Sequence, residues 1–191
     1  WGSSTKLEVS GGQEDHLATS EGVEVVVTGG TVGSGGGYDV IFDGGQFGTF
    51  RSSGVVRVGG ATRGDWVQVD RAARLDVTGG VVGVFQPWAG AEVHLSGCEV
   101  VSFVNDQRDV GGFFQVFVYL DGYFANGEFV DVLAGERVVY QPDQLSGIYA
   151  DGSVFDLDFD VRFGTAGVTL IGVRSTVPEP SVLAGAVIGI G

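Results

Sequence analysis

The chain is marked first by the residues it lacks. Its 191 residues include no methionine, one cysteine, one lysine and four prolines. The single cysteine, Cys98, excludes an internal disulfide, and the scarcity of proline excludes collagen-like and proline-rich disordered chains. Because methionine is absent and the sequence begins at Trp1, we expect it to be a fragment of a longer chain with a signal peptide upstream.

Positive charge is also scarce. Ten Lys and Arg residues face 24 Asp and Glu residues, which gives a net charge of −14. Nucleic acid is therefore not an expected partner, because the phosphate backbone requires a basic protein face. Long anionic polysaccharides are disfavoured for the same reason unless a divalent cation bridges them. An acidic surface of this kind suits solubility and calcium binding at extracellular concentrations.

Glycine, in contrast, is abundant and regularly placed. Residues 7–101 contain an imperfect repeat with the pattern apolar-x-apolar-small-Gly-small, and 35 of the 191 residues are glycine. The aligned glycines lie about 17 residues apart on average and are Gly11, Gly29, Gly44, Gly60, Gly79 and Gly97. The apolar-x-apolar triplet directs two side chains inward. The glycines then turn the corner where neighbouring rungs approach closely.

This repeat predicts an all-β fold in which residues 1–103 form a parallel β-solenoid. A single rung cannot bury its apolar face alone, so neighbouring rungs must stack. We expect an inward ladder of Val27, Phe42, Val58, Val77 and Leu95. The repeat resembles those of right-handed parallel β-helices in bacterial surface and autotransporter-like proteins, and the resemblance implies a right-handed solenoid. An antiparallel sandwich with glycine-rich hairpins is the alternative.

The repeat stops at about Val104, and we expect residues 104–175 to form a mainly antiparallel β-region. This region would cap the solenoid, whose bare strand edges otherwise invite association. Strands are expected at Phe113–Leu120, Glu128–Leu133, Val154–Phe163 and Val168–Val173. Turns are expected at Asp121-Gly122, Asn126-Gly127 and Asp151-Gly152. A loop is expected over Gln141–Ile148, which contains Pro142-Asp143.

Residues 176–191 form a third segment, in which the triplet Pro178-Glu179-Pro180 precedes an apolar run, Val182–Gly191. Prolines fix φ and favour extended geometry in the residue before them, so the triplet forms an accessible peptide. The segment resembles the PEP-CTERM sorting signal of bacterial exported proteins, in which VPEP precedes a hydrophobic helix and a basic cluster. The resemblance implies that the signal is Val177, Pro178, Glu179, Pro180 and Ser181.

The resemblance also implies a route and a location. Proteins with this signal are exported, are anchored transiently in the inner membrane and are processed by an exosortase-type sorting enzyme. The mature protein would lie at the cell surface or outside the cell. The apolar run here has ten residues and no basic cluster, whereas a spanning helix needs about twenty. We therefore expect the sequence to stop within the tail. An apolar strand after a proline-rich turn is the alternative.

Acidic residues suggest one metal site. Asp156, Asp158 and Asp160 alternate with apolar residues, so three carboxylates share one strand face and repel one another. A hard cation with oxygen ligands, above all Ca²⁺, would relieve that repulsion. A solvated acidic face is the alternative, and no other cofactor is expected. Residues 34–41 also resemble a single calcium-binding nonapeptide of the repeats-in-toxin family, whose sites require stacked consecutive copies.

Aromatic residues between the repeat cores suggest a second kind of site. Trp66 and Trp88, together with Phe85 and Tyr38, are expected in second strands or loops, where flat rings can stack on sugars. The alternative is that these rings close the ends and corners of the solenoid.

Residues suited to catalysis are few. His94 occupies an outward position of its repeat and is expected to be a solvated surface residue, while His16 lies in a polar stretch. Cys98 stands where sister repeats have glycine, which predicts a small buried thiol. No nucleophile elbow, phosphate-binding loop or zinc-ligand spacing is present. We therefore expect no enzymatic activity.

Two hypotheses of function follow. The first is a non-catalytic exported protein at the cell surface or in an extracellular polysaccharide matrix. The alternative is a parallel β-helix that binds or cleaves carbohydrate. That alternative requires Asp, Arg and aromatic residues to converge on one solenoid face.

Overall fold

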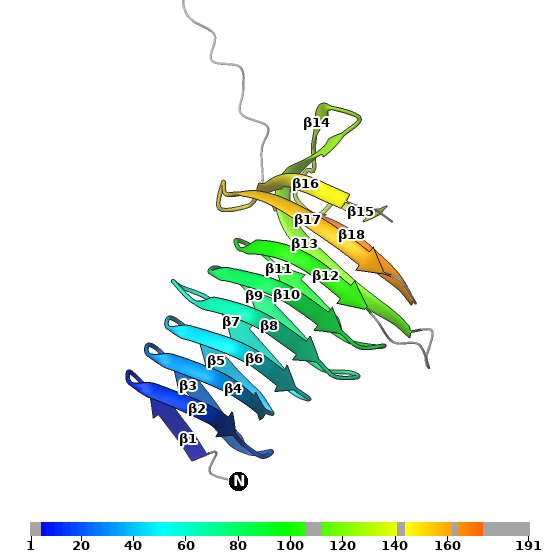
Figure 1. Cartoon of the computed structure of the whole chain (residues 1–191). Helices are drawn as coiled ribbons and strands as arrows, with labels where there is room; N and C mark the ends of the chain where they lie inside the picture. Colours follow the sequence, from blue (N-terminus) through cyan, green and yellow to red (C-terminus); the bar gives the residue numbers. More distant parts are fainter. Residues whose placement is uncertain (1–4, 106–111, 141–143, 162–163, 174–191) are drawn as a thin grey trace, which may run out of the picture.

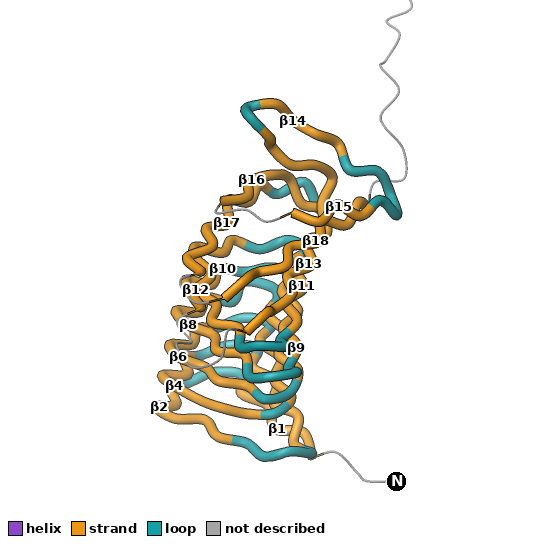
Figure 2. The backbone as a smooth tube through the Cα atoms, turned by 90° about the vertical axis from the view of Figure 1, so that its right-hand side faces the viewer, coloured by secondary structure: helices purple, strands orange, loops and turns teal. Residues whose placement is uncertain are grey.

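The computed structural model is an all-β parallel solenoid. It describes residues 5–105, 112–140, 144–161 and 164–173. Two ladders of parallel strands, here called sheet A and sheet B, run side by side and are joined by corners (Figures 1 and 2). The predicted fold class is therefore confirmed, and the sandwich alternative is wrong.

Six successive strand pairs form the regular part of the rod. Sheet A receives β1 (Thr5–Val9), β3 (Val23–Val27), β5 (Asp39–Phe42), β7 (Val55–Val58), β9 (Arg74–Val77) and β11 (Glu92–Leu95). Sheet B receives β2 (Gln13–Ala18), β4 (Thr31–Gly37), β6 (Gln46–Ser52), β8 (Arg63–Val69), β10 (Val81–Pro87) and β12 (Glu99–Asn105). Each strand pairs in parallel with the strand two positions along the chain.

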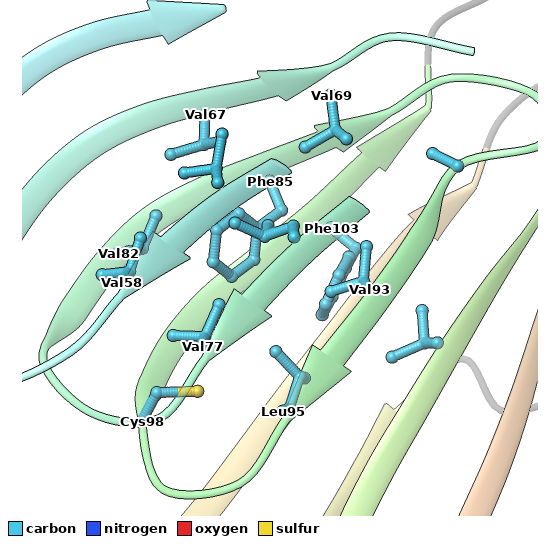
Figure 3. Close-up of a cluster of buried hydrophobic side chains, with 14 of the residues drawn as sticks. Val58, Val67, Val69, Val77, Val82, Phe85, Val93, Leu95, Cys98 and Phe103 are labelled. Atoms are coloured by element: carbon cyan, nitrogen blue, oxygen red, sulfur yellow. The ribbon is translucent and has the colours of Figure 1, made fainter. Parts of the chain in front are cut away.

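The predicted inward ladder forms in sheet A. In register, Val27 pairs with Phe42, Phe42 with Val58, Val58 with Val77, and Val77 with Leu95. All five side chains are at most 1% exposed. Figure 3 shows Val58, Val77 and Leu95 pointing into the same interior as side chains from the opposite ladder.

Sheet B fills the other half of the core with aromatic rings. The ring centroids of Phe85 and Phe103 lie 5.5 Å apart. Phe103 stacks on Phe159 with a centroid distance of 4.9 Å and an interplanar angle of 9°. Buried aromatic pairs of this kind add stability beyond the area they bury. These rings and the sheet A ladder belong to one continuous hydrophobic core.

The corners depend on backbone that only glycine adopts easily. The second glycine in four of the glycine pairs, at positions 12, 30, 45 and 80, has φ between +77° and +85°. A Cβ at Gly30 would lie 2.6 Å from the carbonyl oxygen of Gly12 on the previous rung. Glycine is thus required both by the left-handed backbone and by the close approach of adjacent rungs.

The parallel stacking extends further along the chain than the repeat does. β13 (Gly112–Ala125) pairs in parallel with β11, and β18 (Gly164–Gly172) pairs in parallel with β13. In sheet B, β17 (Val154–Val161) pairs in parallel with β12. These strands continue the rod, because their apolar faces fit the same two ladders.

Within the described parts of the chain, every antiparallel pair includes one of three strands that lie between β13 and β17 in the sequence. They are β14 (Glu128–Asp131), β15 (Arg137–Tyr140) and β16 (Gln144–Tyr149). β14 pairs with β13, β15 pairs with β18, and β16 pairs with both β13 and β17. In Figure 1 the β13–β14 hairpin projects from the end of the rod. We call the part of the chain from β13 to β18 the cap.

Two local predictions in the cap are wrong. The expected loop over 141–148 contains strand β16, in which Leu145, Gly147 and Tyr149 are buried at every second position. The expected turn at Asp121-Gly122 lies inside β13, at a bulge. There a Cβ on Gly122 would meet the Phe129 ring and the Val130 carbonyl, so this glycine permits close packing instead of a turn.

Two other turn predictions are confirmed. Asn126 and Gly127 have φ of 52° and 83° and connect β13 to β14, as expected for a two-residue hairpin turn. Asp151-Gly152 forms the turn before β17.

The rod has two distinct ends. β1 and β2 lie at one end, and the cap lies at the other, where the last described residue follows β18 (Figure 1). Within the described residues, no helix is long and apolar enough to cross a membrane.

Candidate functional site

The sorting-signal residues lie outside the described part of the chain. They are Val177, Pro178, Glu179, Pro180 and Ser181, and the described chain ends at Val173. The prediction of a sorting signal therefore depends on the sequence alone. The structure adds only the place where the chain leaves the fold, at the cap end of the rod.

The predicted calcium ligands lie on β17. Asp156 and Asp158 are exposed, while Phe155, Leu157 and Phe159 between and beside them are buried. The two carboxylates therefore share the outer face, as the alternation predicts. Asp160 belongs to the same strand, but its side chain lies outside the described residues. Among the side chains that are described, no three His, Cys, Asp or Glu groups are placed to hold a metal ion.

The predicted sugar-stacking residues separate into different environments. Trp66 is half-buried on the outer face of β8, aligned with Thr49 and Val84 on the neighbouring strands. Phe85 points inward and is fully buried, so its expected exposure is wrong. The reason is register: Phe85 aligns with Val67 and not with the outward-facing Trp66.

Trp88 and Tyr38 lie at corners of the rod. Trp88 follows β10, and its backbone N–H donates to the carbonyl of Val69 at 2.8 Å. Tyr38 lies between β4 and β5 and is half-buried. Both rings occupy the side of the rod where sheet B turns back into sheet A.

A pocket lies at this side of the rod, and we call it the corner pocket. Its volume is about 290 Å³. Side chains from successive rungs line it together with the bare backbone of two glycines; the lining residues are Thr19, Ser20, Glu21, Gly36, Gly37, Tyr38, Arg51, Ser53 and Asp70. The lining groups are hydroxyls, carboxylates, one guanidinium and one phenol ring.

An ion pair forms one wall of the corner pocket. Nε of Arg51 donates to both carboxylate oxygens of Asp70, each at 3.0 Å. The guanidinium carbon of Arg51 also lies 5.3 Å from the centre of the Trp88 ring, within cation–π range. Trp88 and Asp70 therefore both contact the guanidinium group of Arg51, which forms the polar wall.

A second polar cluster lies on the outer face of sheet A. Arg57, Asp76 and His94 align on successive strands, in the outward position that was predicted for His94. Asp76 accepts from Nε of Arg74 at 2.7 Å and lies 3.9 Å from Nε of Arg57. With Thr78, Ser96 and Tyr119 these residues surround a pocket of about 280 Å³.

His94 itself is not the solvated residue that was expected. Its side chain is only 14% exposed. The imidazole stacks on Phe117 at 4.7 Å, and its Nδ1 shares a hydrogen bond of 3.0 Å with the Tyr119 hydroxyl. Both partners come from β13, so the cap covers this histidine.

This environment favours the neutral imidazole. Burial lowers the pKa of His94 below its usual value, and Arg74 acts in the same direction. Asp76 and Glu92 oppose the decrease without cancelling it. Nε2 of His94 lies 3.7 Å from the Glu92 carboxylate. The cluster is a packed seam between rod and cap.

Cys98 is buried, as predicted. Its Sγ lies 3.4 Å from the Tyr149 hydroxyl of β16. Burial raises the pKa of the Cys98 thiol to about 11, so the reactive thiolate is scarce at neutral pH. This residue therefore contributes to the packing between β16 and the rod.

Comparison with known proteins gave no match. No protein-family model, no curated protein and no solved structure matches the chain. Function must therefore be argued from the residues and their geometry.

Sequence reasoning missed the central pair of the corner pocket. Arg51 and Asp70 lie 19 positions apart, and neither belongs to an apolar-x-apolar triplet. Extending the repeat alignment into the second strands would have placed Arg51 beside Gln68, two residues before Asp70. That alignment was the available signal.

Proposed function

We propose that this protein is a non-catalytic exported protein that acts at the cell surface or in an extracellular polysaccharide matrix. In this proposal an exosortase-type enzyme sorts it through Pro178-Glu179-Pro180, with transient anchoring in the inner membrane. The observation that carries the proposal is the position of this triplet, directly before an apolar segment and after the folded body.

The shape of the molecule supports this function. The described chain leaves the fold at the cap end, while β1 and β2 lie at the opposite end (Figure 1). A tail held in a membrane would therefore project the long axis of the rod away from the bilayer. The parallel ladders and the continuous core suit a rigid spacer or matrix component, because each rung is supported by its neighbours.

The sorting proposal is tested by following the C-terminus in the parent cell. Mass spectrometry of the mature native protein should find the apolar segment removed. Replacing Pro178, Glu179 and Pro180 with alanines should leave uncut precursor in the inner membrane. Replacing Ser175 and Thr176 with alanines is the matched control and should leave processing unchanged. An intact C-terminus in cells that possess the sorting enzyme would reject the proposal.

A second candidate function, carbohydrate binding, is favoured by one specific observation. Tyr38, Arg51, Asp70 and Trp88 gather at one corner of the rod, and this is the combination of Asp, Arg and aromatic residues that the hypothesis requires. Carboxylates and guanidinium groups bond sugar hydroxyls, and ring faces cover the apolar faces of sugars. Affinity electrophoresis in gels containing soluble polysaccharides tests this function.

The two predicted tryptophans provide an internal comparison in that experiment. Trp88→Ala should weaken retardation in the gel, because Trp88 supports Arg51. Trp66→Ala should leave retardation unchanged if the corner is the only binding face. If Trp66→Ala loses retardation and Trp88→Ala does not, the binding face is the outer surface of β8.

A further inference from the structure

We propose that the corner pocket binds a neutral sugar ring of a polysaccharide, and not a carboxylated or sulfated sugar. This inference rests on the second proposed function, carbohydrate binding, and does not depend on the sorting route. It names the ligand class by the chemistry of the pocket.

The pocket has space because one of its lining positions lacks a side chain. On the outer face of sheet B, Gly36 aligns between Ala18 and Arg51, so a gap opens beneath the arginine. Gly36 does not have a positive φ, so its missing side chain creates space and does not serve a turn. Gly37 has a different role: an added Cβ would meet the hydroxyl of Thr19 and would lie 2.9 Å from a methyl group of Val40, so this glycine permits close packing toward the core.

The polar groups around this space match sugar hydroxyls. Arg51 uses Nε on Asp70, which leaves its other N–H groups as donors. The Asp70 carboxylate has more than one lone pair per oxygen and can accept from two adjacent hydroxyls. Ser20 and Ser53 add groups that both donate and accept.

Charge selects the neutral class. The pocket contains one cation, Arg51, and two carboxylates, Asp70 and Glu21. Asp70 already neutralises Arg51, so an acidic sugar would face the uncompensated charge of Glu21 without a free cation. The whole chain, with a net charge of −14, adds to this repulsion.

Size and shape suit one or two rings of a longer chain. The volume of about 290 Å³ lies at the small end for ligand pockets. Tyr38 provides an aromatic wall on one side. The pocket opens on the side of the rod, so the rest of a polysaccharide can continue into solvent.

The test uses the full chain and two kinds of soluble polysaccharide. Neutral probes are laminarin and galactomannan, and the acidic probe is polygalacturonate. Affinity electrophoresis and isothermal titration calorimetry should show binding to at least one neutral probe and none to polygalacturonate. Stronger binding to polygalacturonate would overturn the proposal.

Asp70→Asn gives the sharpest discrimination, because its effect has opposite signs for the two ligand classes. For a neutral sugar, the loss of a charged acceptor should weaken binding about tenfold. For an acidic sugar, the released Arg51 should strengthen binding. The matched control is Asp76→Asn. This variant also changes an arginine-paired aspartate, but one that lies on sheet A, and it should leave binding unchanged.

A variant that fills the pocket tests the site independently of the charge change in Asp70→Asn. Gly36→Val should fill the gap and abolish binding; the nearest atom to its Cβ is a carbonyl oxygen at 3.3 Å, so thermal melting should confirm that the variant folds. Neutral-probe binding that survives both Asp70→Asn and Gly36→Val would overturn this site while leaving carbohydrate binding in place. If no probe binds, the second proposed function fails together with this inference, whereas the sorting proposal is tested separately by mass spectrometry.

Discussion

The rod and the cap differ in how completely they bury their large apolar side chains. In the rod from β3 to β12, apolar side chains point into one interior, and a ladder such as Val27 to Leu95 is at most 1% exposed. Among the described residues, six large apolar side chains remain exposed in the cap, against one in the rod, Leu7. Those six are Phe124, Phe129, Val130, Leu133, Val139 and Val154, and Val173 directly after the cap is also exposed.

The difference follows from the number of neighbours that each strand has. A strand inside the rod has a parallel partner on both sides and the opposite sheet across the core. Among the strands that the structure describes, β14 pairs only with β13, and all four of its residues are exposed. A two-stranded hairpin alone buries little surface and is marginally stable. Repetition therefore achieves burial that local hairpins cannot achieve.

The largest expected effect comes from placing the same charge in both regions. Val77→Asp would bury an unpaired carboxylate in the ladder and should cost several kcal/mol of unfolding free energy. Val139→Asp, at a side chain that is 77% exposed in the cap, should change stability by less than about 0.5 kcal/mol. Chemical denaturation measures both. Equal stabilities of the two variants would reject the ladder and the comparison with it.

A smaller effect is expected from the close approach of neighbouring rungs. A Cβ at Gly48 would collide with the carbonyl of Gly33, so Gly48→Ala should cost about 1–3 kcal/mol through overpacking. Gly11→Ala is the control, because no atom lies within 4 Å of its added Cβ. A Gly48→Ala protein that melts with the parent would show that the rungs can separate without cost.

Calcium tests β17, the cap strand that pairs with β12 of the rod. If Asp156, Asp158 and Asp160 bind calcium with a Kd of about 10⁻⁴–10⁻³ M, then 10 mM calcium should stabilise the fold by about 1–3 kcal/mol. The double variant Asp156→Asn and Asp158→Asn should lose this increase in melting temperature. An unchanged melting temperature of the parent at saturating calcium removes the site.

The smallest effect concerns the seam where the cap covers His94. Folding lowers the pKa of His94, so below the ordinary histidine pKa of about 6.5 the unfolded chain binds more protons. Stability should therefore decrease as the pH falls from 7 through 6.5 toward the lowered pKa. His94→Gln should reduce this slope. Identical slopes in the parent and the variant would show that His94 is accessible when the cap is in place.

The repeat was sufficient to predict the rod, because its information is local and is copied six times. Each copy places two apolar residues two positions apart and then a glycine. One copy therefore predicts where the strand lies, which face points inward and where the chain turns. Tyr38 and Trp88 were recognised as aromatic residues outside the repeat core. Phe85 was misplaced, because the alignment did not extend into the second strands.

The cap could not be predicted to the same depth, since its pairings cross long stretches of sequence. Strand β17 pairs with β12 only after β13, β14, β15 and β16 have intervened. The pair Asp121-Gly122 has the composition of a turn, but its surroundings keep it in a strand. Local composition does not say which sheet edge a strand will join.

The sequence by itself determined the all-β class, the period, the inward ladder, the acidic surface and the buried thiol of Cys98. These properties depend on residue type and on spacing within one repeat. Because every rung stacks in the same way, the pattern of one repeat describes all of them. Only the tertiary structure decided that β13, β17 and β18 prolong the rod, that His94 lies under the cap, and that Arg51 meets Asp70 beside a gap left by Gly36. Those outcomes depend on which side chains are adjacent across rungs, and adjacency is set by the register of the stack and not by distance along the chain.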